Sequence, residues 1–232
     1  MPHGNLNREP WNKGLTKYTH PSVLKISKTL SLQTTSNFSK WQQKNKRYYA
    51  QLKQGIKLAE LYGVLLGDGY IEKLPRTERL IISFHSREKR RIHRIDRFIG
   101  NLFKTKPKIR NRLMSHCIDV YLYQKNISQR LGFPTGKKAS FNLHIPRWVK
   151  KSDKYLLKCL KGLFESDGDL CIDKKYQTNV IKFTNTNQTL LDDVHQSLVH
   201  LGYHPQRRML DVRLAQKKEV TDFVHRIDFR KV

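Results

Sequence analysis

The chain has 232 residues, with 46 Lys and Arg against 19 Asp and Glu, a formal net charge of +27 and a pI of about 10.2. Solubility alone needs about 2–8 net charges for a small domain, so this excess is typical of a protein that binds nucleic acid. No apolar run reaches the ~20 residues of a membrane span, and no signal-peptide core is present. Three scattered cysteines lack zinc-ligand spacing. We therefore expect an intracellular protein, in the cytoplasm and nucleoid or an organelle matrix, with no membrane partner.

Residues 1–57 are expected to form a basic N-terminal extension. They contain 11 Lys and Arg but a single acidic residue, Glu9, and too few aliphatic residues to build a core. The stretch Pro10–Lys17 is turn-like, and Val23–Leu30 suits a short helix. Aromatic residues such as Trp11 alternate with lysines such as Lys13, a pattern that suits DNA contact. A tail that packs over the main domain is the alternative.

From residue 58 onward the hydrophobic spacing becomes regular. Apolar residues at helical spacing predict helices, and strict alternation predicts strands. The elements expected in this half are a helix Leu58–Gly67, a strand Arg79–Ser86, a basic helix Glu88–Phe103, a hairpin of Lys108–Leu113 with His116–Gln124, and a helix Asn126–Leu131.

The same order then recurs after loop-forming residues Gly132–Ala139. The elements expected here are a helix Lys154–Ser166, strands Asp169–Asp173 and Thr178–Thr184, a helix Leu190–Leu201, a hairpin within Arg207–Ala215 and a helix Lys217–Ile227. This repetition predicts an α+β fold of pseudo-symmetric tandem αββαββα repeats. We expect repeat domains at 58–148, which includes the linker, and 149–232.

Two matching stretches head the repeats, Leu61–Gly69 and Leu160–Gly168, and each ends in an aspartate followed by glycine. The aspartates, Asp68 and Asp167, lie 99 positions apart (167 − 68). One Asp-Gly pair alone would be an ordinary helix stop. Two copies at equivalent places in a repeat favour a shared site built from both aspartates.

Small residues four positions apart, Gly63 with Gly67 and Gly162 with Ser166, would let the two helices pack closely. Two carboxylates beside two helix C-termini repel one another, so a cation would stabilise them. Carboxylate and carbonyl oxygens are the ligands that Mg²⁺ prefers. We therefore expect Mg²⁺ at Asp68 and Asp167, with oxygens from Gly67 and Ser166; Mn²⁺ or Ca²⁺ could occupy the same site.

The paired motifs resemble those of the LAGLIDADG homing endonucleases in their monomeric, two-motif form. The resemblance rests on Gly63, Asp68 and Gly69 in one motif and Gly162, Asp167 and Gly168 in the other. Tyr62 and Lys161 stand where the family often has alanine. The resemblance spans Leu58 to the C-terminus. It implies a two-helix central interface, two saddle-shaped antiparallel sheets on the DNA major groove, and catalytic metals bound by both aspartates.

The resemblance further implies a monomeric, intron-encoded hydrolase that cuts both DNA strands across the minor groove and leaves short 3′ overhangs. Its partner would be double-stranded DNA with a long, degenerate, pseudo-palindromic target. The family also places a basic residue near the end of each repeat's last strand, where Lys125 and Lys217 stand; ordinary phosphate contact is their alternative role. The Trp11–Lys17 run resembles modular DNA-binding segments of intron-encoded nucleases. An RNA-binding intron maturase, with intron RNA as partner, and a non-cleaving DNA-binding regulator are the alternatives.

On this fold the strand faces opposite the core would lie on DNA, and their side chains can reach phosphates or base edges. A merely solvated polar face is the alternative. The DNA-contact residues expected from the alternation are Arg79, Ser83, His85, Arg110, Arg112, Tyr121 and Tyr123 in the first half, and Lys175, Lys182, Thr184, Arg207 and Arg213 in the second.

Overall fold

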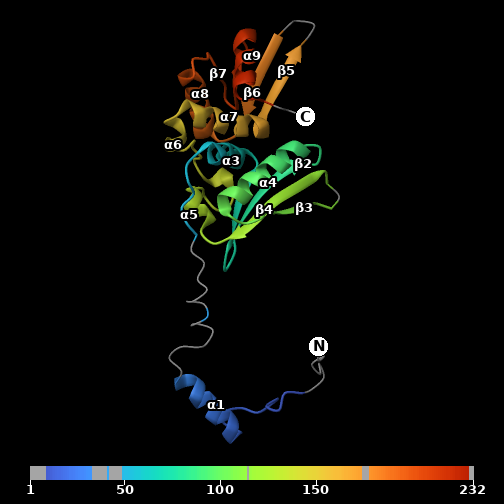
Figure 1. Cartoon of the computed structure of the whole chain (residues 1–232), viewed down its shortest axis with the longest axis vertical. Coiled ribbons are helices and arrows are strands. Elements are labelled where there is room, and N and C mark those ends of the chain that lie inside the picture. The colour runs from blue at the N-terminus through green and yellow to red at the C-terminus, as the bar shows by residue number, and fades with distance from the viewer. Residues whose placement is uncertain (1–8, 33–40, 42–48, 114, 174–177, 230–232) are drawn as a thin grey trace. The chain divides into compact units, whose positions relative to one another are not determined.

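A computed structural model of the chain describes residues 9–32, 41, 49–113, 115–173 and 178–229 (Figure 1). The chain divides into two compact units, Met1–Tyr48 and Tyr49–Val232. In the first unit, α1 (Pro21–Leu32) has no buried residue, and the preceding turn exposes 62% of Trp11. The predicted short helix is therefore present. The described part of this unit presents its side chains to solvent.

The second unit begins with the first repeat. Its elements are α3 (Ile56–Gly67), β1 (Gly69–Lys73), β2 (Glu78–His85), α4 (Lys89–Phe103), β3 (Lys108–Asn111), β4 (Cys117–Gln124) and α5 (Ile127–Leu131). The four strands form an antiparallel sheet in the order β1-β2-β4-β3. The edge strand β1 was absent from the predicted elements; it starts directly after the first motif, where Gly69 pairs with Ile82.

The second repeat follows a linker that contains η1 (Lys138–Ser140) and α6 (Arg147–Lys150). Its elements are α7 (Asp153–Asp167), β5 (Gly168–Asp173), β6 (Thr178–Thr184), α8 (Gln188–His200), β7 (Gln206–Arg207), β8 (Asp211–Leu214) and α9 (Lys217–Arg226). The antiparallel sheet has the order β5-β6-β8-β7, which matches the first sheet strand for strand. The pseudo-symmetric α+β prediction is confirmed.

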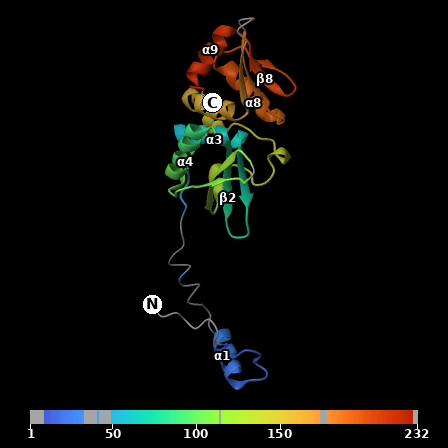
Figure 2. The same ribbon diagram turned by 90° about the vertical axis from the view of Figure 1, so that its right-hand side faces the viewer.

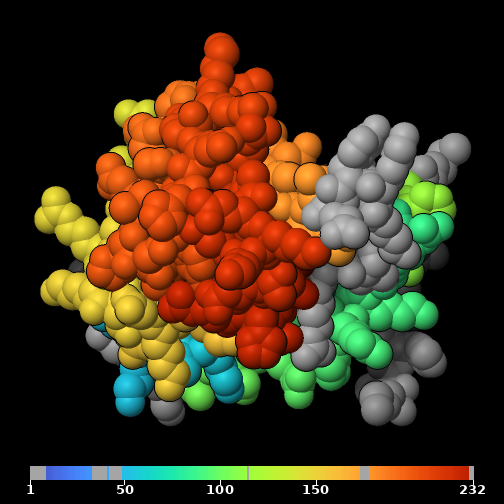
Figure 3. Space-filling view, turned by 90° about the horizontal axis from the view of Figure 1, so that it is seen from above, coloured from blue at the N-terminus to red at the C-terminus, as the bar shows by residue number. Residues whose placement is uncertain are grey.

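The motif helices α3 and α7 pack against each other between the two sheets (Figures 1 and 2). A methyl group on Gly63 would lie 2.0 Å from the Cys159 carbonyl oxygen, and one on Gly162 would lie 2.4 Å from the Glu60 carbonyl oxygen. Only glycine therefore allows this approach of the two backbones. Seen from above, the second repeat, in yellow to red, lies over the cyan and green first repeat (Figure 3).

The last helix of each repeat ends in the same way. Gly132 after α5 and Asp228 after α9 both adopt the left-handed conformation, with φ of 64° and 51°. The Tyr62 hydroxyl donates to the Gly132 carbonyl at 3.0 Å, and the Lys161 ammonium donates to the Asp228 carbonyl at 2.8 Å. Tyr62 and Lys161, which stand where the motif often has alanine, thus hold the ends of α5 and α9 in place.

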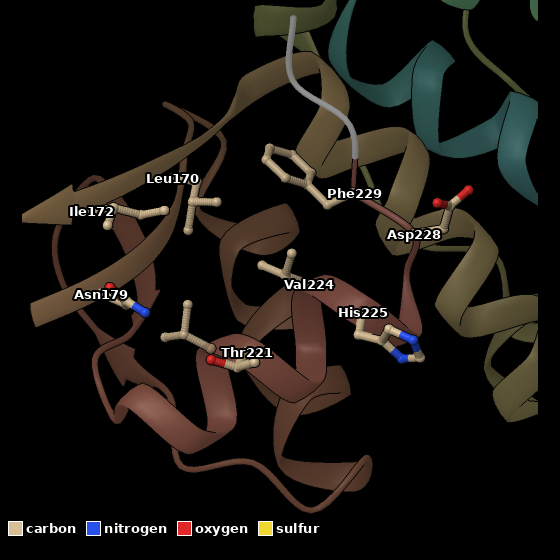
Figure 4. Close-up of a pocket in the computed structure, with 9 residues that line it drawn as sticks. Leu170, Ile172, Asn179, Thr221, Val224, His225, Asp228 and Phe229 are labelled. Carbon is tan, nitrogen blue, oxygen red and sulfur yellow. The ribbon is translucent and has the colours of Figure 1, made fainter.

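The repeats differ at their edge strands. In the first repeat, the linker reaches the edge of β1, where the Gly136 N–H donates to the Ile71 carbonyl at 2.9 Å. In the second repeat, a groove of about 680 Å³ lies between α9 and the edge strand β5 with its neighbour β6 (Figure 4). Apolar side chains that include Leu170, Val224 and Phe229 line it. This groove lies on the helix-covered side of the sheet.

Candidate functional site

The C-terminal ends of the motif helices meet. A methyl group built on Gly67 would lie 2.3 Å from the Ser166 Cβ and 3.5 Å from Asp167 Oδ2. Asp68 caps α3, and its backbone N–H donates to the Val64 carbonyl at 2.8 Å. The geometry therefore brings the acidic residue of each repeat to one place, as the spacing of the motifs predicts.

Asp68 is oriented by a buried arginine from α4. Arg91, only 7% exposed, donates to Asp68 Oδ2 at 3.0 Å and to Ser166 Oγ at 2.5 Å. A further bond to Glu88, at 2.8 Å, fixes the other end of the guanidinium. Arg91 thus ties the first repeat to the motif helix of the second. Hydrogen bonds between charged groups are roughly twice as strong as neutral ones.

Asp167 has a different and uncharged partner. The Asn185 amide, which follows β6, donates to Asp167 Oδ2 at 2.9 Å. Burial raises the pKa of Asp167, the nearby charge of Asp68 raises it further, and Lys138, Asn185 and Arg91 offset only part of the increase. An additional cation at this position would therefore favour the ionised carboxylate.

A lysine from the linker completes the site. The Lys138 ammonium donates to the Leu66 carbonyl at 3.0 Å and also to the Gly67 carbonyl. Burial lowers the pKa of Lys138, while the charges of Asp167 and Asp68 act in the opposite direction. The partially negative end of α3 thus already attracts one cationic group.

The donor set suits a hard divalent cation. No group of three or more His, Cys, Asp and Glu side chains that could hold a metal occurs among the described residues. Mg²⁺, however, is usually bound by one or two carboxylates together with water and substrate phosphates. Asp68 and Asp167 fit that pattern, whereas the Gly67 carbonyl already accepts a hydrogen bond from Lys138. Burial and the charge of Asp68 raise the pKa of Asp167, and a bound cation would oppose both effects.

The two lysines nominated from the sequence lie elsewhere. Lys125 follows Gln124 of β4, which pairs with Glu78 of β2. Gly69, next to Asp68, pairs with Ile82, which lies four residues from Glu78 along the same strand. At about 3.4 Å per residue, this separation is about 14 Å. Lys217 begins α9, beyond the far end of β8. The linker's Lys138 occupies the place beside the aspartates, and only its Gly-Lys-Lys context in an irregular loop marked it in the sequence.

The outer face of the first sheet carries the predicted polar side chains. Buried Asp119 accepts hydrogen bonds from Arg110 and Arg112, both at 2.9 Å, and from Ser83 at 2.8 Å. Burial would raise the pKa of Asp119, but these hydrogen bonds outweigh it and lower the pKa. Next to this cluster, the Arg79 guanidinium donates to the Tyr123 hydroxyl at 3.2 Å. The cluster holds two arginines side by side on the face.

The remaining members of the first-sheet set also lie on this face. His85 is exposed at the end of β2, and Tyr121 packs edge-on against Tyr123 with ring centroids 5.7 Å apart. The guanidinium of Arg110 lies over the Tyr121 ring at 5.9 Å. The face therefore combines fixed arginines with aromatic rings.

In the second sheet the prediction needs one correction. Lys182 pairs with Arg213, and exposed Thr184 lies on the same face. Arg207 instead pairs with Val212 in the strand register, and its side chain donates to Asp192 of α8 at 2.9 Å. The hairpin register thus turns Arg207 toward the helices.

Three other nominated positions lie outside this unit or outside the described residues. Lys175 lies outside the described residues. In the first unit, Trp11 is exposed, and Lys13 forms an ion pair with Glu9 at 2.6 Å. No helix in the described part of the chain is long and apolar enough to cross a membrane.

The fold and the paired aspartates define a class of two-repeat α+β protein with a shared acidic site at its helix interface. Residues 154–229 match the model of the LAGLIDADG-like domain. Together with the solved structures below, this match confirms the two-repeat LAGLIDADG fold that the paired motifs predict; the resemblance of the Trp11–Lys17 run to DNA-binding segments stays a prediction.

Solved structures with the same fold support this assignment. The homing endonuclease I-DmoI in complex with DNA and Mn is 18% identical, with a TM-score of 0.54, and the match covers 76% of this chain and 98% of that chain. I-WcaI bound to its DNA recognition sequence is 16% identical, with a TM-score of 0.50 and coverage of 87% and 98%. The N-terminal LAGLIDADG domain of DUF199/WhiA is 14% identical, with a TM-score of 0.51 and coverage of 76% and 84%. No curated protein sequence matches the chain.

Proposed function

We propose that this protein is a site-specific DNA endonuclease of the homing type, which uses a divalent cation to hydrolyse both strands of a double-stranded target. The observation that carries the proposal is the meeting of Asp68 and Asp167, one from each repeat, at the ends of two closely packed helices. One carboxylate per repeat matches the need to cut one strand per half-site. I-DmoI in complex with DNA and Mn, and I-WcaI bound to its DNA recognition sequence, share the fold and support this reading.

The residues around the aspartates have separate tasks in this proposal. When bound, the divalent cation would activate water and stabilise charge at the scissile phosphate. Asp68 and Asp167 would hold it. Arg91 and Asn185 keep the two carboxylates oriented through their hydrogen bonds at 3.0 and 2.9 Å.

Lys138 is the proposed positive group beside the scissile phosphate. Its ammonium lies at the helix ends, where it can donate to a phosphate oxygen as negative charge develops there. A fixed donor of this kind contributes most where water is excluded. Lys125 and Lys217 are then proposed as phosphate contacts away from the reacting atoms.

The outer faces of the two sheets are the proposed DNA-reading surface. Arginine in fixed geometry suits bidentate contact with guanine or phosphate, and the Asp119 cluster fixes two arginines on one face. Cleavage across the minor groove with short 3′ overhangs, a long degenerate target and an intron-encoded origin complete the proposal. The N-terminal residues 1–57 would add contacts outside the central target.

The test is a cleavage selection. A plasmid library with randomised inserts is incubated with the full chain and Mg²⁺ or Mn²⁺, and the cut ends are sequenced. Asp68→Asn and Asp167→Asn should each abolish double-strand cleavage, whereas Asp96→Asn, a carboxylate in the middle of α4, should cut like the parent. Cleavage that survives both motif substitutions would remove the aspartates from the mechanism.

A further inference from the structure

The opposite ends of the motif helices form a basic surface that the proposed cleavage site does not use. Two adjoining hollows of about 630 and 380 Å³ lie there, and both are lined by Asn101 and Lys104. We call this surface the basic end and define it by its six cationic side chains, Lys53, Lys57, Arg97, Lys104, Lys106 and Lys154.

The charge of the basic end is not neutralised within the protein. Among the residues that the structure describes, none of the six side chains has an ion-pair partner within 4.0 Å. Asp96 is the single acidic residue that lines either hollow. At the aspartate end, by contrast, Arg91 and Lys138 are engaged by Asp68, Glu88 and the helix carbonyls. The basic end therefore has cationic groups available for an anionic partner.

Backbone polarity adds to the charge of these side chains. The larger hollow is lined by the first residues of α3, including Lys57, and by Lys154 and Tyr155 in the first turn of α7. Neither helix has a side-chain hydrogen bond at its N-cap, Gly55 or Ser152. Free N–H groups at helix N-termini favour anions. Two helix ends and the lysines thus point to phosphate as the ligand chemistry.

The basic end and the cleavage site cannot share one stretch of duplex. The α3 helix has 12 residues, which at 1.5 Å each separates its ends by about 18 Å. The buried interface of α3 with α7 fills that distance. A phosphate backbone at the basic end must therefore belong to a different segment of nucleic acid.

The surroundings favour duplex phosphates over other anionic partners. None of the apolar residues that line the hollows is among the exposed large hydrophobics, so nothing here would insert into a membrane. Among the described residues, the single aromatic ring that lines either hollow, Tyr155, is partly buried and packs edge-on against Trp148 with centroids 5.8 Å apart, so the surface has no series of rings on which successive unpaired bases could stack. Lysine ammonium groups contact phosphates as point charges without reading bases.

We propose that the basic end is a second, sequence-independent binding surface for duplex DNA. It would hold a separate DNA segment through its phosphates while the outer sheet faces hold the first segment. This inference rests on the proposed function only in assigning the first duplex to the sheets. A protein with two such surfaces can pass directly from one segment to another, which speeds the search for a rare target.

The test compares two variants of the full chain that lose the same charge. The first carries Lys57→Gln, Lys104→Gln and Lys154→Gln in the basic end; the control carries Lys73→Gln, Lys137→Gln and Lys218→Gln at exposed positions elsewhere. Equal melting temperatures and circular dichroism spectra establish that both are folded. The readouts are the release of a labelled duplex as unlabelled duplex is added, and the capture of a second duplex by protein on bead-bound DNA.

The parent and the control should release labelled DNA faster as competitor concentration rises and should capture the second duplex. In the basic-end variant, the competitor-dependent release rate should fall at least tenfold, and the capture of a second duplex should be lost. Three lost phosphate contacts should also reduce the salt slope of second-duplex binding by about 2.7.

Release that does not depend on competitor in the parent, or equal behaviour of the two variants, would overturn the proposal. Capture of structured RNA in preference to duplex DNA would also overturn it. These outcomes are independent of cleavage, because the basic-end variant should still cut a single target, and a protein that never cuts can still capture two duplexes.

Discussion

Replacing a glycine at the centre of the motif interface should separate the two aspartates. In Gly63→Ala, the new methyl group meets the Cys159 carbonyl oxygen at 2.0 Å, about 1.4 Å inside an ordinary 3.4 Å contact. The obstacle is backbone, so the helices themselves must move apart. Overpacking of this kind costs about 1–3 kcal/mol, against about 1 kcal/mol gained from the better helix propensity of alanine.

The larger effect should be on cleavage. A displacement of about 1 Å in a catalytic group can reduce a rate about 100-fold. Gly162→Ala should behave alike, because its methyl group would lie 2.4 Å from the Glu60 carbonyl oxygen. Gly100→Ala in α4 is the matched control: its methyl group would lie 3.6 Å from Pro107 Cδ, which is ordinary contact.

Thermal melts and single-turnover cleavage measure the two effects. We expect Gly100→Ala to melt at or above the parent temperature and to cut at the parent rate. Gly63→Ala should lose about 100-fold in cleavage even under conditions where it remains folded. Parent-like stability and cleavage in Gly63→Ala would refute the close approach of the helices as the basis of the site.

Four further results are expected. Lys138→Met should lower single-turnover cleavage about 100-fold while DNA binding persists, whereas exposed Lys137→Met should cut normally; equal rates would contradict the role of Lys138. Divalent cation at 100 times its dissociation constant should stabilise the parent by about 2.7 kcal/mol in thermal melts, and Asp68→Asn should lose this gain; an unchanged gain would place the cation elsewhere. Folding raises the pKa of Asp167 above its ordinary value of 3.8, so ionisation of this carboxyl destabilises the metal-free fold. The protonated carboxyl favours the fold at low pH, and this contribution to stability is lost as pH rises through the raised pKa. Asp167→Asn should therefore gain in melting temperature relative to the parent as pH rises from about 4 to 8, and a difference that is flat or shrinks with pH would argue against the shift. Removal of residues 1–57 should weaken salt-dependent DNA binding and leave metal-dependent nicking detectable; unchanged binding would show that the extension makes no DNA contact.

Much of the fold could be predicted because its signals are local and repeated. The alternation in Ile118–Gln124 and the helical spacing in Glu88–Phe103 depend only on neighbouring residues. Strand β1 was missed because its five residues, Gly69–Lys73, are too few and too mixed to show alternation. The turn of Arg207 toward α8 follows from a two-residue strand, β7, whose register depends on pairing with β8.

The same distinction between local sequence signals and tertiary packing applies to the residues of the site. Asp68 and Asp167 were accessible to sequence reasoning because each stands in a repeated motif. Arg91, Lys138 and Asn185 reach the aspartates from a helix, a linker and a strand end that only tertiary packing brings together. They also have no counterparts related by the repeat, so the repeat pattern could not reveal them.

This lack of symmetry distinguishes the two halves of the site. Arg91 pairs with Asp68 and also with Ser166 of the other repeat, whereas Asp167 accepts a hydrogen bond from the neutral amide of Asn185. The two carboxylates therefore meet different electrostatic surroundings although the backbones around them match.

The proposed function requires that one carboxylate from each repeat forms a single metal-dependent cleavage site. The most direct measurement is strand-resolved cleavage of a selected target by the parent, Asp68→Asn and Asp167→Asn in Mg²⁺ or Mn²⁺, alongside binding to the same DNA. We expect the parent to cut both strands and each variant to bind the target without producing a double-strand break. Full cleavage by either variant, or tight target binding by the parent without cleavage in either metal, would contradict it.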